Sequence, residues 1–473
     1  MISAVLSAKR KEALRDHCGV FGIYAPGEDV AKITYYALHS LQHRGQEAAG
    51  ISVSDGSNIK SIKKIGLVTG VFNDRNLAKL KGFMAVGHNR YSTTGSNTKN
   101  NIQPIIISDK GQSFAVAHNG NIVNAGELAD KLNGTERMST SDTEVLALSI
   151  FQRKEKTWGE KILNSTSDLK GAYSIVASSK DTLFAFRDPW GFRPLTIGKL
   201  SGYFVIASET CALDTIGATY LRDVAPGEVI SINKKGLTTV GKIRRKQMNY
   251  CLFEYVYLAR PDSIMNNVLV HQVRQRSGEI LAKEAPVKAD LVVAIPDSGT
   301  SSALGYSQAS GIPFGEILIK NRYIGRTFIS PEQHIREQGV KMKFNPMKQI
   351  VEGKRIIVVD DSIVRGTTMR QIVEVLKKCG AKKIHLRICS PPVRWPCFFG
   401  VDTPERRQLI ASDKTVRQIN DFIGADTLKY LSLSGLIRAS KQKSNTLCTA
   451  CFSGKYPMKV DMSFKKNVFE SAC

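Results

Sequence analysis

The chain has 473 residues, 42% of them hydrophobic, and its 67 Lys and Arg against 42 Asp and Glu give a formal net charge of +25. This length allows two or three domains with real cores. No hydrophobic run approaches a membrane-spanning helix, and residues 1–17 lack the core of a secretory signal, so we expect a cytoplasmic, non-membrane protein. The positive charge is spread along the chain without zinc-finger spacing, which argues against specific nucleic-acid binding.

Cys18 is the first residue that suggests chemistry. It follows a short charged leader, residues 1–17, and precedes an apolar stretch that begins at Gly19. If the leader were cleaved after His17, the thiol of Cys18 would lie beside its own α-amine, whose ordinary pKa of about 8 suits a base. That arrangement is typical of N-terminal-nucleophile hydrolases. The alternative is a buried core cysteine, which is the commoner role for an isolated thiol.

Four further motifs favour the catalytic role of Cys18 over that of a buried core cysteine. They are Leu41–Glu47 (LQHRGQE), Gly87–Gly95 (GHNRYSTTG), Ala117–Ile122 (AHNGNI) and Ser141–Glu144 (SDTE). Together with Cys18 they resemble a class II glutamine amidotransferase domain. The resemblance implies that the chain releases ammonia from the side-chain amide of glutamine.

The same resemblance implies a role for each matching residue. Cys18 would attack the amide, and the Asn119 side chain with the Gly120 N–H would form the oxyanion hole. Arg90 would bind the carboxylate of glutamine and Asp142 its α-ammonium. The histidines of these motifs are expected to be structural, because an N-terminal amine would fill the role of the base; they are His43, His88 and His118.

This domain is expected to span residues 18–246. The strings Asp188–Leu195 and Ala207–Thr210 resemble others found across the class, and many short strands suit a layered αββα sandwich. A basic stretch, Lys242–Lys246, is interpreted as the linker. The next domain is expected over residues 247–440, followed by a C-terminal tail at 441–473.

The second domain contains a strand, a loop and a helix in succession. Leu291–Ile295 is a buried apolar run, Pro296–Thr300 is a polar loop with Gly299, and a helix is expected from Ser301. A long polar segment, about Gly325–Pro346, follows. We expect it to act as a lid that excludes water from a reactive substrate.

A second unit of the same kind follows at Arg355–Thr368 (RIIVVDDSIVRGTT). Ile356–Val359 is a run of strand length, Asp360 and Asp361 close it, and apolar residues recur at helical spacing from Met369. The backbone N–H groups of such a loop and the positive end of the next helix can hold a phosphate. The acidic pair would repel a bare phosphate and suits sugar hydroxyls and a hard divalent cation. The alternative is a strand end with a capped helix.

The string resembles the motif by which type I phosphoribosyltransferases bind phosphoribosyl pyrophosphate (PRPP). Asp360 and Asp361 would then hold the ribose hydroxyls and, with Ser298 of the upstream loop, Mg²⁺. The residues that would line the 5′-phosphate are Ser362, Gly366, Thr367 and Thr368. The expected fold is therefore an α+β N-terminal-nucleophile hydrolase followed by an α/β type I phosphoribosyltransferase.

The order of the two domains resembles the amidophosphoribosyltransferase family. That resemblance implies glutamine-dependent conversion of PRPP to 5-phosphoribosylamine, a first step of purine synthesis. It also implies feedback by purine nucleotides, with Lys320 and Arg322 as phosphate contacts, and a homotetramer. Two alternatives remain open: a sugar-phosphate transaminase that shares the glutamine domain, which the PRPP motif disfavours, and a PRPP-sensing regulator with a silent glutaminase domain.

The nine cysteines suggest a further subdivision. An odd number in a cytoplasmic chain argues against a disulfide framework. The pair Cys448 and Cys451 has CxxC spacing, which also fits a zinc half-site or a redox pair. In the cluster-containing branch of the family, Cys251 and Cys397 fall where the other two ligands of a [4Fe–4S] cluster lie. Zinc in the same cage is the alternative. The leader 1–17 matches the position of that branch's propeptide. The cysteines expected to be core or surface thiols are Cys211, Cys379, Cys389 and Cys473.

Overall fold

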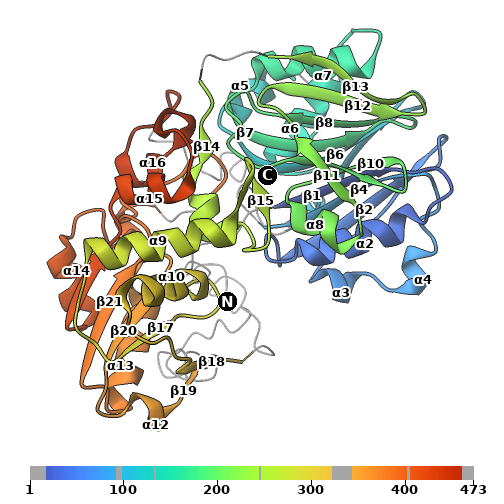
Figure 1. Ribbon diagram of the computed structural model, residues 1–473. Coiled ribbons are helices and arrows are strands. Elements are labelled where there is room, and N and C mark those ends of the chain that lie inside the picture. The colour runs from blue at the N-terminus through green and yellow to red at the C-terminus, as the bar shows by residue number, and fades with distance from the viewer. Residues whose placement is uncertain are drawn as a thin grey trace, which may run out of the picture.

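The computed structural model describes residues 18–91, 98–132, 135–243, 247–321, 344–401 and 405–460. Two bodies lie next to each other, one from the first half of the chain and one from the second (Figure 1). The leader 1–17, the linker residues 244–246, Arg322 and Cys473 lie outside the described residues, as does nearly all of the expected lid.

The N-terminal body contains two antiparallel sheets. The first has the order β11 (Thr219–Asp223), β9 (Thr196–Leu200), β10 (Tyr203–Ala207), β1 (Gly19–Tyr24), β4 (Met84–Arg90), β2 (Ala48–Ser54) and β3 (Ile59–Ile65). The second has the order β13 (Gly236–Lys242), β12 (Glu228–Asn233), β8 (Leu183–Arg187), β7 (Gly171–Ser178), β6 (Gln112–Ile122) and β5 (Ile105–Asp109).

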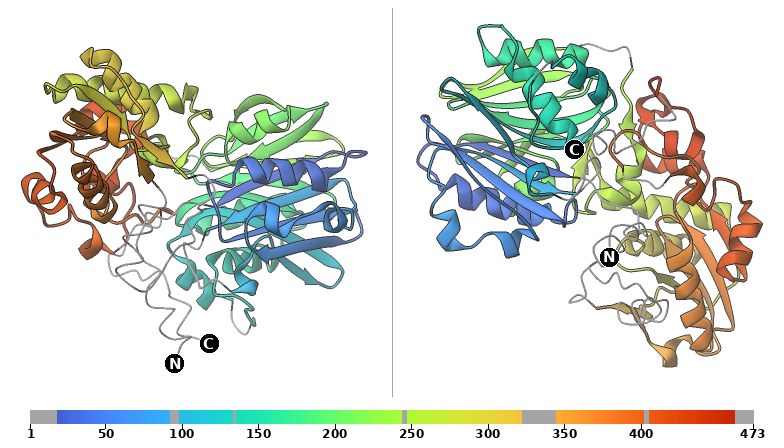
Figure 2. Two further views of the ribbon diagram at one scale, coloured as in Figure 1. Left: turned by 90° about the horizontal axis from the view of Figure 1, so that it is seen from below. Right: turned by 180° about the vertical axis from the view of Figure 1, so that it is seen from behind.

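The two sheets pack face to face and helices cover their outer faces. One core lies between the sheets and includes Val86 and Val176. A second joins the first sheet to α2 (Val30–Ser40), α3 (Val68–Val71), α4 (Asp74–Leu77) and α8 (Thr210–Thr215). A third joins the second sheet to α5 (Ala125–Asp130), α6 (Asp142–Phe151) and α7 (Trp158–Asp168). These four layers are the predicted αββα sandwich, and Figure 2 shows them from two further directions.

The C-terminal body is built on a parallel sheet with the order β17 (Leu291–Ala294), β20 (Arg355–Asp360), β21 (Lys383–Ile388) and β22 (Thr427–Tyr430). Alternate residues of β20 face opposite cores. Ile357 and Val359 pack with α9 (Val270–Glu284) and α10 (Thr300–Ser310). Ile356 and Val358 pack with α13 (Thr367–Lys378) and α14 (Val416–Ile423). Because both faces are covered, the strand is hydrophobic throughout, as expected for a parallel sheet.

The last described part of the chain, residues 433–460, packs into this second body. After α15 (Leu433–Ser440), the short strand β23 (Leu447–Cys448) pairs in parallel with β14 (Tyr250–Cys251), and α16 (Ala450–Ser453) follows. Leu447 and Phe452 belong to the core that also contains α9. The remaining short elements are β15 (Ile264–Met265), β16 (Val268–Leu269), β18 (Leu318–Lys320), β19 (Phe344–Pro346), α12 (Lys348–Val351) and a π-helical turn at Glu254–Leu258.

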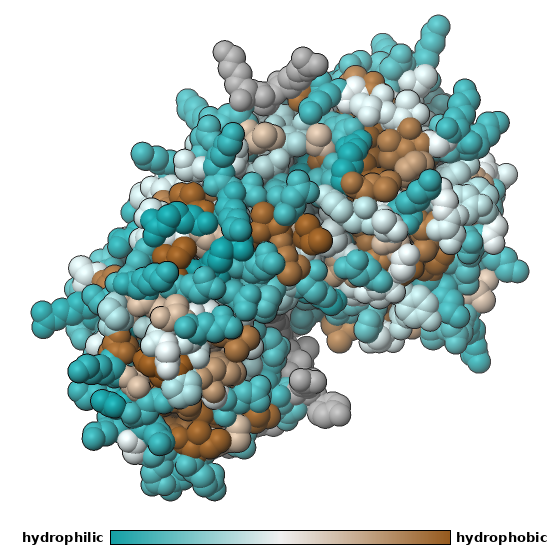
Figure 3. Space-filling view, in the orientation of Figure 1, coloured by the Kyte–Doolittle hydropathy of each residue, from teal (hydrophilic) through white to brown (hydrophobic). Residues whose placement is uncertain are grey.

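In the described ranges, no helix is long and apolar enough to span a bilayer. The face shown in Figure 3 is mostly hydrophilic, and its hydrophobic patches are separate from one another.

Candidate active sites

The first site is a pocket in the N-terminal body. It brings together four of the residues singled out in the sequence, Cys18, Arg90, Gly120 and Asp142, which lie up to 124 positions apart (142 − 18 = 124). The other lining residues are Tyr91, Gln103, His118, Ser141 and Thr143. The pocket therefore combines a thiol, a cation and an anion, as the binding of an amino acid beside a nucleophile requires.

Strand pairing explains why these residues meet. Cys18 directly precedes β1, whose Gly19 lies opposite Asn89 of β4, so Cys18 and Arg90 are placed side by side. Gly120 lies in β6 of the other sheet. Asp142 begins α6, where the Ser141 hydroxyl caps the helix, and a carboxylate is favoured there by the helix dipole.

The thiol of Cys18 is buried, with 6% of its surface exposed. Burial raises the pKa of Cys18 to about 11, although the neighbouring Arg90 opposes the shift. Its Sγ lies 3.4 Å from the carbonyl oxygen of Tyr91, to which the thiol donates. At neutral pH the thiol is therefore protonated, and it needs a base before it can act as a nucleophile.

Asp142 is held in place by the backbone. Its Oδ2 accepts a hydrogen bond from the Ile122 N–H at 3.0 Å and lies 3.7 Å from Nδ1 of His118. The amide of Asn119 is different, because it is completely buried and neither of its polar atoms has a hydrogen-bond partner among the described residues. A buried amide without a partner is costly unless a ligand satisfies it.

Five pocket residues, Tyr91, Gln103, His118, Ser141 and Thr143, were not predicted from the sequence to have a role at the site. The Gln103 side chain accepts from the His118 N–H at 2.7 Å and donates to the Thr143 hydroxyl at 3.0 Å, and the His118 ring lies 3.3 Å from that hydroxyl. His118, expected to be structural, lines the pocket. His88 is buried, which lowers its pKa to about 3. No sequence pattern identifies Gln103 and Thr143, because each contacts a partner that is remote in sequence and near only in the folded protein.

The second candidate site lies at the carboxyl edge of the parallel sheet. β17 and β20 are neighbours that run in the same direction, so the loops after them meet at one edge. Gly299 in the first loop is packed so tightly that a Cβ there would lie 2.5 Å from the Val359 carbonyl oxygen. Ser298 is thereby brought beside the strand that ends at Asp360.

The loop after β20 leads directly into α13. Gly366 has a φ of +77° and begins the helix, and no described side chain caps its N–H groups. The Asp361 N–H donates to Asp360 Oδ1 at 2.9 Å, and the Ser362 hydroxyl donates to the Asp361 carboxylate. Thr367 and Thr368, the first residues of the helix, are exposed. The helix end thus presents unpaired donors to solvent, where they can bind an anion.

The remaining part of this site concerns the expected lid. β18 and β19 pair with Lys320 opposite Phe344, so the described residues at the two ends of the expected lid lie next to each other. Lys320 forms an ion pair with Asp297 of the first loop.

The four cysteines predicted to bind a cluster line a single cavity. They are Cys251, Cys397, Cys448 and Cys451, and the other walls include aromatic side chains and Arg193. Burial raises the pKa of Cys251 to about 11 and also raises those of Cys448 and Cys451, with the neighbouring thiols adding to each shift. Across the described ranges, no three or more His, Cys, Asp or Glu side chains form a group that could hold a metal ion.

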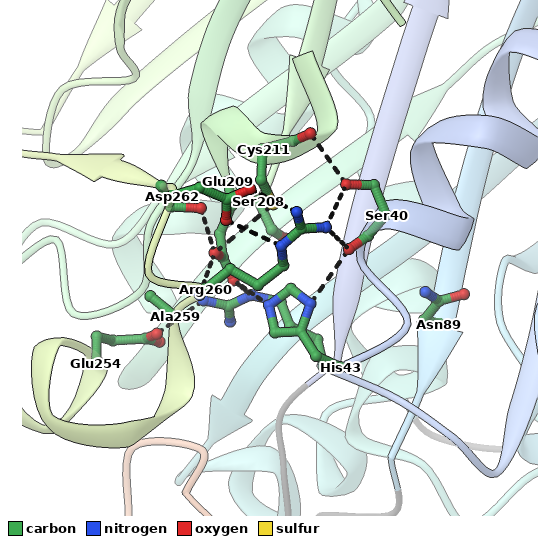
Figure 4. A network of polar contacts seen from close by, with 12 residues as sticks. Ser40, His43, Asn89, Ser208, Glu209, Cys211, Glu254, Ala259, Arg260 and Asp262 are labelled. Carbon is green, nitrogen blue, oxygen red and sulfur yellow. Dashed lines mark hydrogen bonds and ion pairs between the residues drawn. The ribbon is translucent and has the colours of Figure 1, made fainter. Parts of the chain in front are cut away.

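A buried ionic network joins the two bodies (Figure 4). Glu209 of the N-terminal body pairs with Arg44 and, at 2.8 Å, with His43, and it accepts from the Ser263 hydroxyl of the C-terminal body at 2.6 Å. Burial alone would raise the pKa of Glu209, but Arg44 and His43 outweigh it and lower the pKa well below its ordinary value.

The network continues through Glu254 of the C-terminal body. Its carboxylate lies 2.7 Å from Arg44 and 2.9 Å from Arg193, both of the N-terminal body. All three side chains are almost completely buried. Removing one partner of such a buried pair leaves an uncompensated charge, so the network fixes how the two bodies dock.

Comparison with known proteins agrees with the two sites. Residues 88–215 match the model of a glutamine amidotransferase domain, and residues 266–423 match that of a phosphoribosyl transferase domain. Amidophosphoribosyltransferase of Mycobacterium tuberculosis is 47% identical over 96% of this chain and 89% of its own length. That of Bacillus subtilis is 47% identical over 95% of this chain and 96% of its own. The chain belongs to the amidophosphoribosyltransferase family.

Solved structures support the same assignment for the fold. The glutamine PRPP amidotransferase of B. subtilis, complexed with ADP and GMP, superposes with a TM-score of 0.89 at 47% identity, covering 94% of this chain and 98% of the other. A structure described as the allosteric regulatory enzyme of purine biosynthesis gives 0.90 with the same identity. The predicted combination of an N-terminal-nucleophile hydrolase and a phosphoribosyltransferase is confirmed.

Proposed function

We propose that this family member transfers the amide nitrogen of glutamine from the Cys18 pocket to PRPP bound at the acidic loop of β20. The products are 5-phosphoribosylamine, glutamate and pyrophosphate, the committed entry to purine nucleotide synthesis. The observation that carries the proposal is the single pocket that contains Cys18, Arg90, Gly120 and Asp142.

The glutaminase step follows from the charges of that pocket. Arg90 binds the carboxylate of glutamine and Asp142 its α-ammonium, which places the amide carbon beside the sulfur of Cys18. Attack by the thiolate gives a tetrahedral oxyanion, which the unpartnered Asn119 amide and the Gly120 N–H stabilise. Collapse expels ammonia, and water hydrolyses the thioester to glutamate.

The base for this step is the α-amine of Cys18 after removal of residues 1–17. The raised pKa of the thiol supports this view, because a thiol with a pKa of about 11 is almost entirely protonated at neutral pH. A neutral amine on the same residue is placed to accept the proton. Without cleavage, the enzyme would use free ammonia only.

At the second site, Asp360 and Asp361 accept hydrogen bonds from the ribose hydroxyls. Ser362, Gly366 and the first turn of α13 hold the 5′-phosphate. Ammonia attacks C1 and pyrophosphate leaves. Mg²⁺, bound by Ser298 and the acidic pair together with the diphosphate, would neutralise the leaving group. Such a site needs only one or two protein carboxylates, because substrate oxygens complete the coordination.

We propose that the four-cysteine cavity holds a [4Fe–4S] cluster, as in the cluster-containing branch of the family. One zinc ion would draw four sulfurs to about 3.8 Å from one another, whereas a cluster binds each thiolate through a different iron and accepts a wider ring. The four thiols surround one cavity whose other walls include aromatic side chains, and four thiolates are the ligand set of such a cluster. When bound, it would tie the C-terminal tail to the body. Anaerobic analysis that finds zinc and no iron or sulfide would contradict this assignment.

Regulation and assembly are proposed from the relatives. The B. subtilis protein was solved in complex with ADP and GMP, so we expect purine nucleotides to bind and inhibit this enzyme. Lys320 remains a predicted phosphate contact, and Arg322, predicted with it, lies outside the described residues. A cytoplasmic homotetramer remains our prediction.

The test is glutamate and pyrophosphate formation by anaerobically purified enzyme, with glutamine or ammonia as donor, compared with a Cys18→Ala variant. We expect the variant to lose glutamine-dependent turnover by about 1,000-fold or more, while ammonia-dependent turnover stays within about twofold. Glutamine-dependent turnover that survives in Cys18→Ala would refute the assignment. A wild type without activity toward either donor would favour a PRPP-sensing regulator.

A further inference from the structure

The segment Cys397–Val401 of the C-terminal body lies against Gly120 of β6, whose N–H is proposed to form part of the oxyanion hole. Gly400 has a φ of +93°, and a Cβ on it would lie 3.0 Å from both the Cα and the carbonyl carbon of Gly120. This spacing is tighter than nine in ten real Cβ contacts, so a side chain at position 400 would push Gly120 by a few tenths of an ångström. Backbone of the C-terminal body therefore packs directly against Gly120, the residue proposed to help bind the oxyanion.

Polar contacts fix the segment on both sides of Gly400. The Asn121 side chain, next to Gly120, donates to the Phe398 carbonyl oxygen at 2.8 Å. Arg193 donates to the Phe399 carbonyl oxygen from Nε at 2.8 Å and from Nη2 at 2.7 Å. Asn121 and Arg193 both belong to the glutaminase body, so the segment is held by the body whose active site it supports.

The side chain of Phe399 adds a hydrophobic contact. Its ring stacks on Phe192 with centroids 4.3 Å apart, and only 2% of the residue is exposed. Its N–H donates to the sulfur of Cys397 at 3.3 Å, so the first residue of the segment is also fixed. Gly400 is thus placed by several independent interactions.

Gly120 is held on one side by strand pairing, because it lies opposite Tyr173 of β7. The φ of Gly120 is +153°, and a side chain on it would collide with the Ala172 carbonyl oxygen at 2.0 Å, so it must be glycine. A glycine has no side chain to lock its orientation, and its neighbours have to provide the constraint. β7 constrains one side through Ala172, and Gly400 constrains another.

We propose that Gly400 and the segment around it are positioning residues for the oxyanion hole, so that the C-terminal body completes the glutaminase site. An oxyanion donor acts only when it points at the place where the charge develops, and loss of one donor costs about 100- to 1,000-fold in kcat. The inference rests on the proposed role of Gly120 in glutamine hydrolysis.

The test compares Gly400→Ala with Gly202→Ala. Gly202 has nearly the same φ, +91°, but a Cβ there has open space within 4 Å. Both variants carry the same backbone strain, and only Gly400→Ala pushes on Gly120. We expect Gly400→Ala to lower kcat with glutamine by about tenfold or more, with KM for glutamine and ammonia-dependent turnover within about twofold of wild type. Gly202→Ala should leave all three unchanged.

A binding measurement separates positioning from general damage. An aldehyde analogue of glutamine forms a tetrahedral adduct with Cys18 and places an oxyanion in the hole, whereas the product glutamate forms no such adduct. We expect Gly400→Ala to weaken the aldehyde by the same factor as kcat and to leave glutamate binding unchanged. Asn121→Asp, which turns a donor toward Phe398 into an acceptor, should show the same separation.

The inference is overturned if Gly400→Ala behaves like Gly202→Ala, or if it weakens the aldehyde and glutamate equally. Equal loss with glutamine and ammonia would also overturn it, because that is the signature of a merely structural defect. Failure of the proposed function is distinct, since it would appear as glutamine-dependent turnover in Cys18→Ala.

Discussion

The two candidate sites differ in how completely they are built. In the glutaminase pocket, Cys18, Arg90 and Asp142 are each at most 6% exposed and held by two packed sheets and a helix. At the phosphoribosyl site, Thr367 and Thr368 are exposed and the donors of the helix end face solvent. The comparison indicates that the amide site is preorganised, whereas the described part of the sugar site is open to solvent. Each prediction below tests one side of this difference.

The largest effect is expected at the open site. Replacing both Asp360 and Asp361 by Asn removes the charge-assisted hydrogen bonds to the ribose, each worth about 1.5–3 kcal/mol. Pyrophosphate release should fall by about 100-fold or more with glutamine and with ammonia alike, whereas glutamate formation without PRPP should change by less than about twofold. The control Asp413→Asn, at an exposed position of the same body, should change neither rate. A loss confined to glutamine would contradict the assignment of the acidic pair.

The next effect concerns the buried ionic network that fixes how the two bodies dock. Glu209→Gln removes the buried carboxylate that pairs with Arg44 and His43. The loss of this partner should cost about 3 kcal/mol in the free energy of unfolding at pH 7. Because the folded-state pKa of Glu209 is below its ordinary value of 4.5, the carboxylate stabilises the fold above that pH. The stabilisation is lost as the pH falls further.

Denaturant unfolding of wild type and Glu209→Gln at several pH values checks this prediction. The difference between the two should be full at pH 7 and shrink below about pH 4.5. The control Glu374→Gln breaks an exposed ion pair with Lys378 and should cost less than about 0.5 kcal/mol. A difference that stays constant with pH would show that Glu209 is not charged in the network.

A smaller effect is expected from Asp142→Asn in the preorganised pocket. The variant keeps an oxygen for the Ile122 N–H but loses the charge that pairs with the α-ammonium of glutamine, so KM for glutamine should rise about 30-fold. With 4-carbamoylbutanoate, which is glutamine without its amino group, wild type and variant should have similar kinetics. An equal loss with both substrates would mean that Asp142 acts only through the fold.

The sequence predicts both folds and most of the chemistry because the residues that react lie in contiguous strings. β20 and its acidic pair can be identified from local pattern alone, since a buried strand, a glycine turn and an amphipathic helix follow one another. The contacts of Gln103 with His118 and Thr143 could not be predicted, because they depend on strand pairing between distant segments. Arg193, Glu254 and Gly400 were missed for a related reason. Their partners lie in the other body, and no local period encodes how two bodies dock.

The central claim is that nitrogen passes from the Cys18 pocket to the Asp360 loop without leaving the enzyme. The direct measurement uses glutamine labelled with ¹⁵N at the amide, in a tenfold excess of unlabelled ammonium at neutral pH, with the phosphoribosylamine trapped and analysed by mass. The account predicts that the product retains the label while glutamine is saturating. Product nitrogen that matches the unlabelled pool would contradict it, because the two sites would then communicate only through solvent.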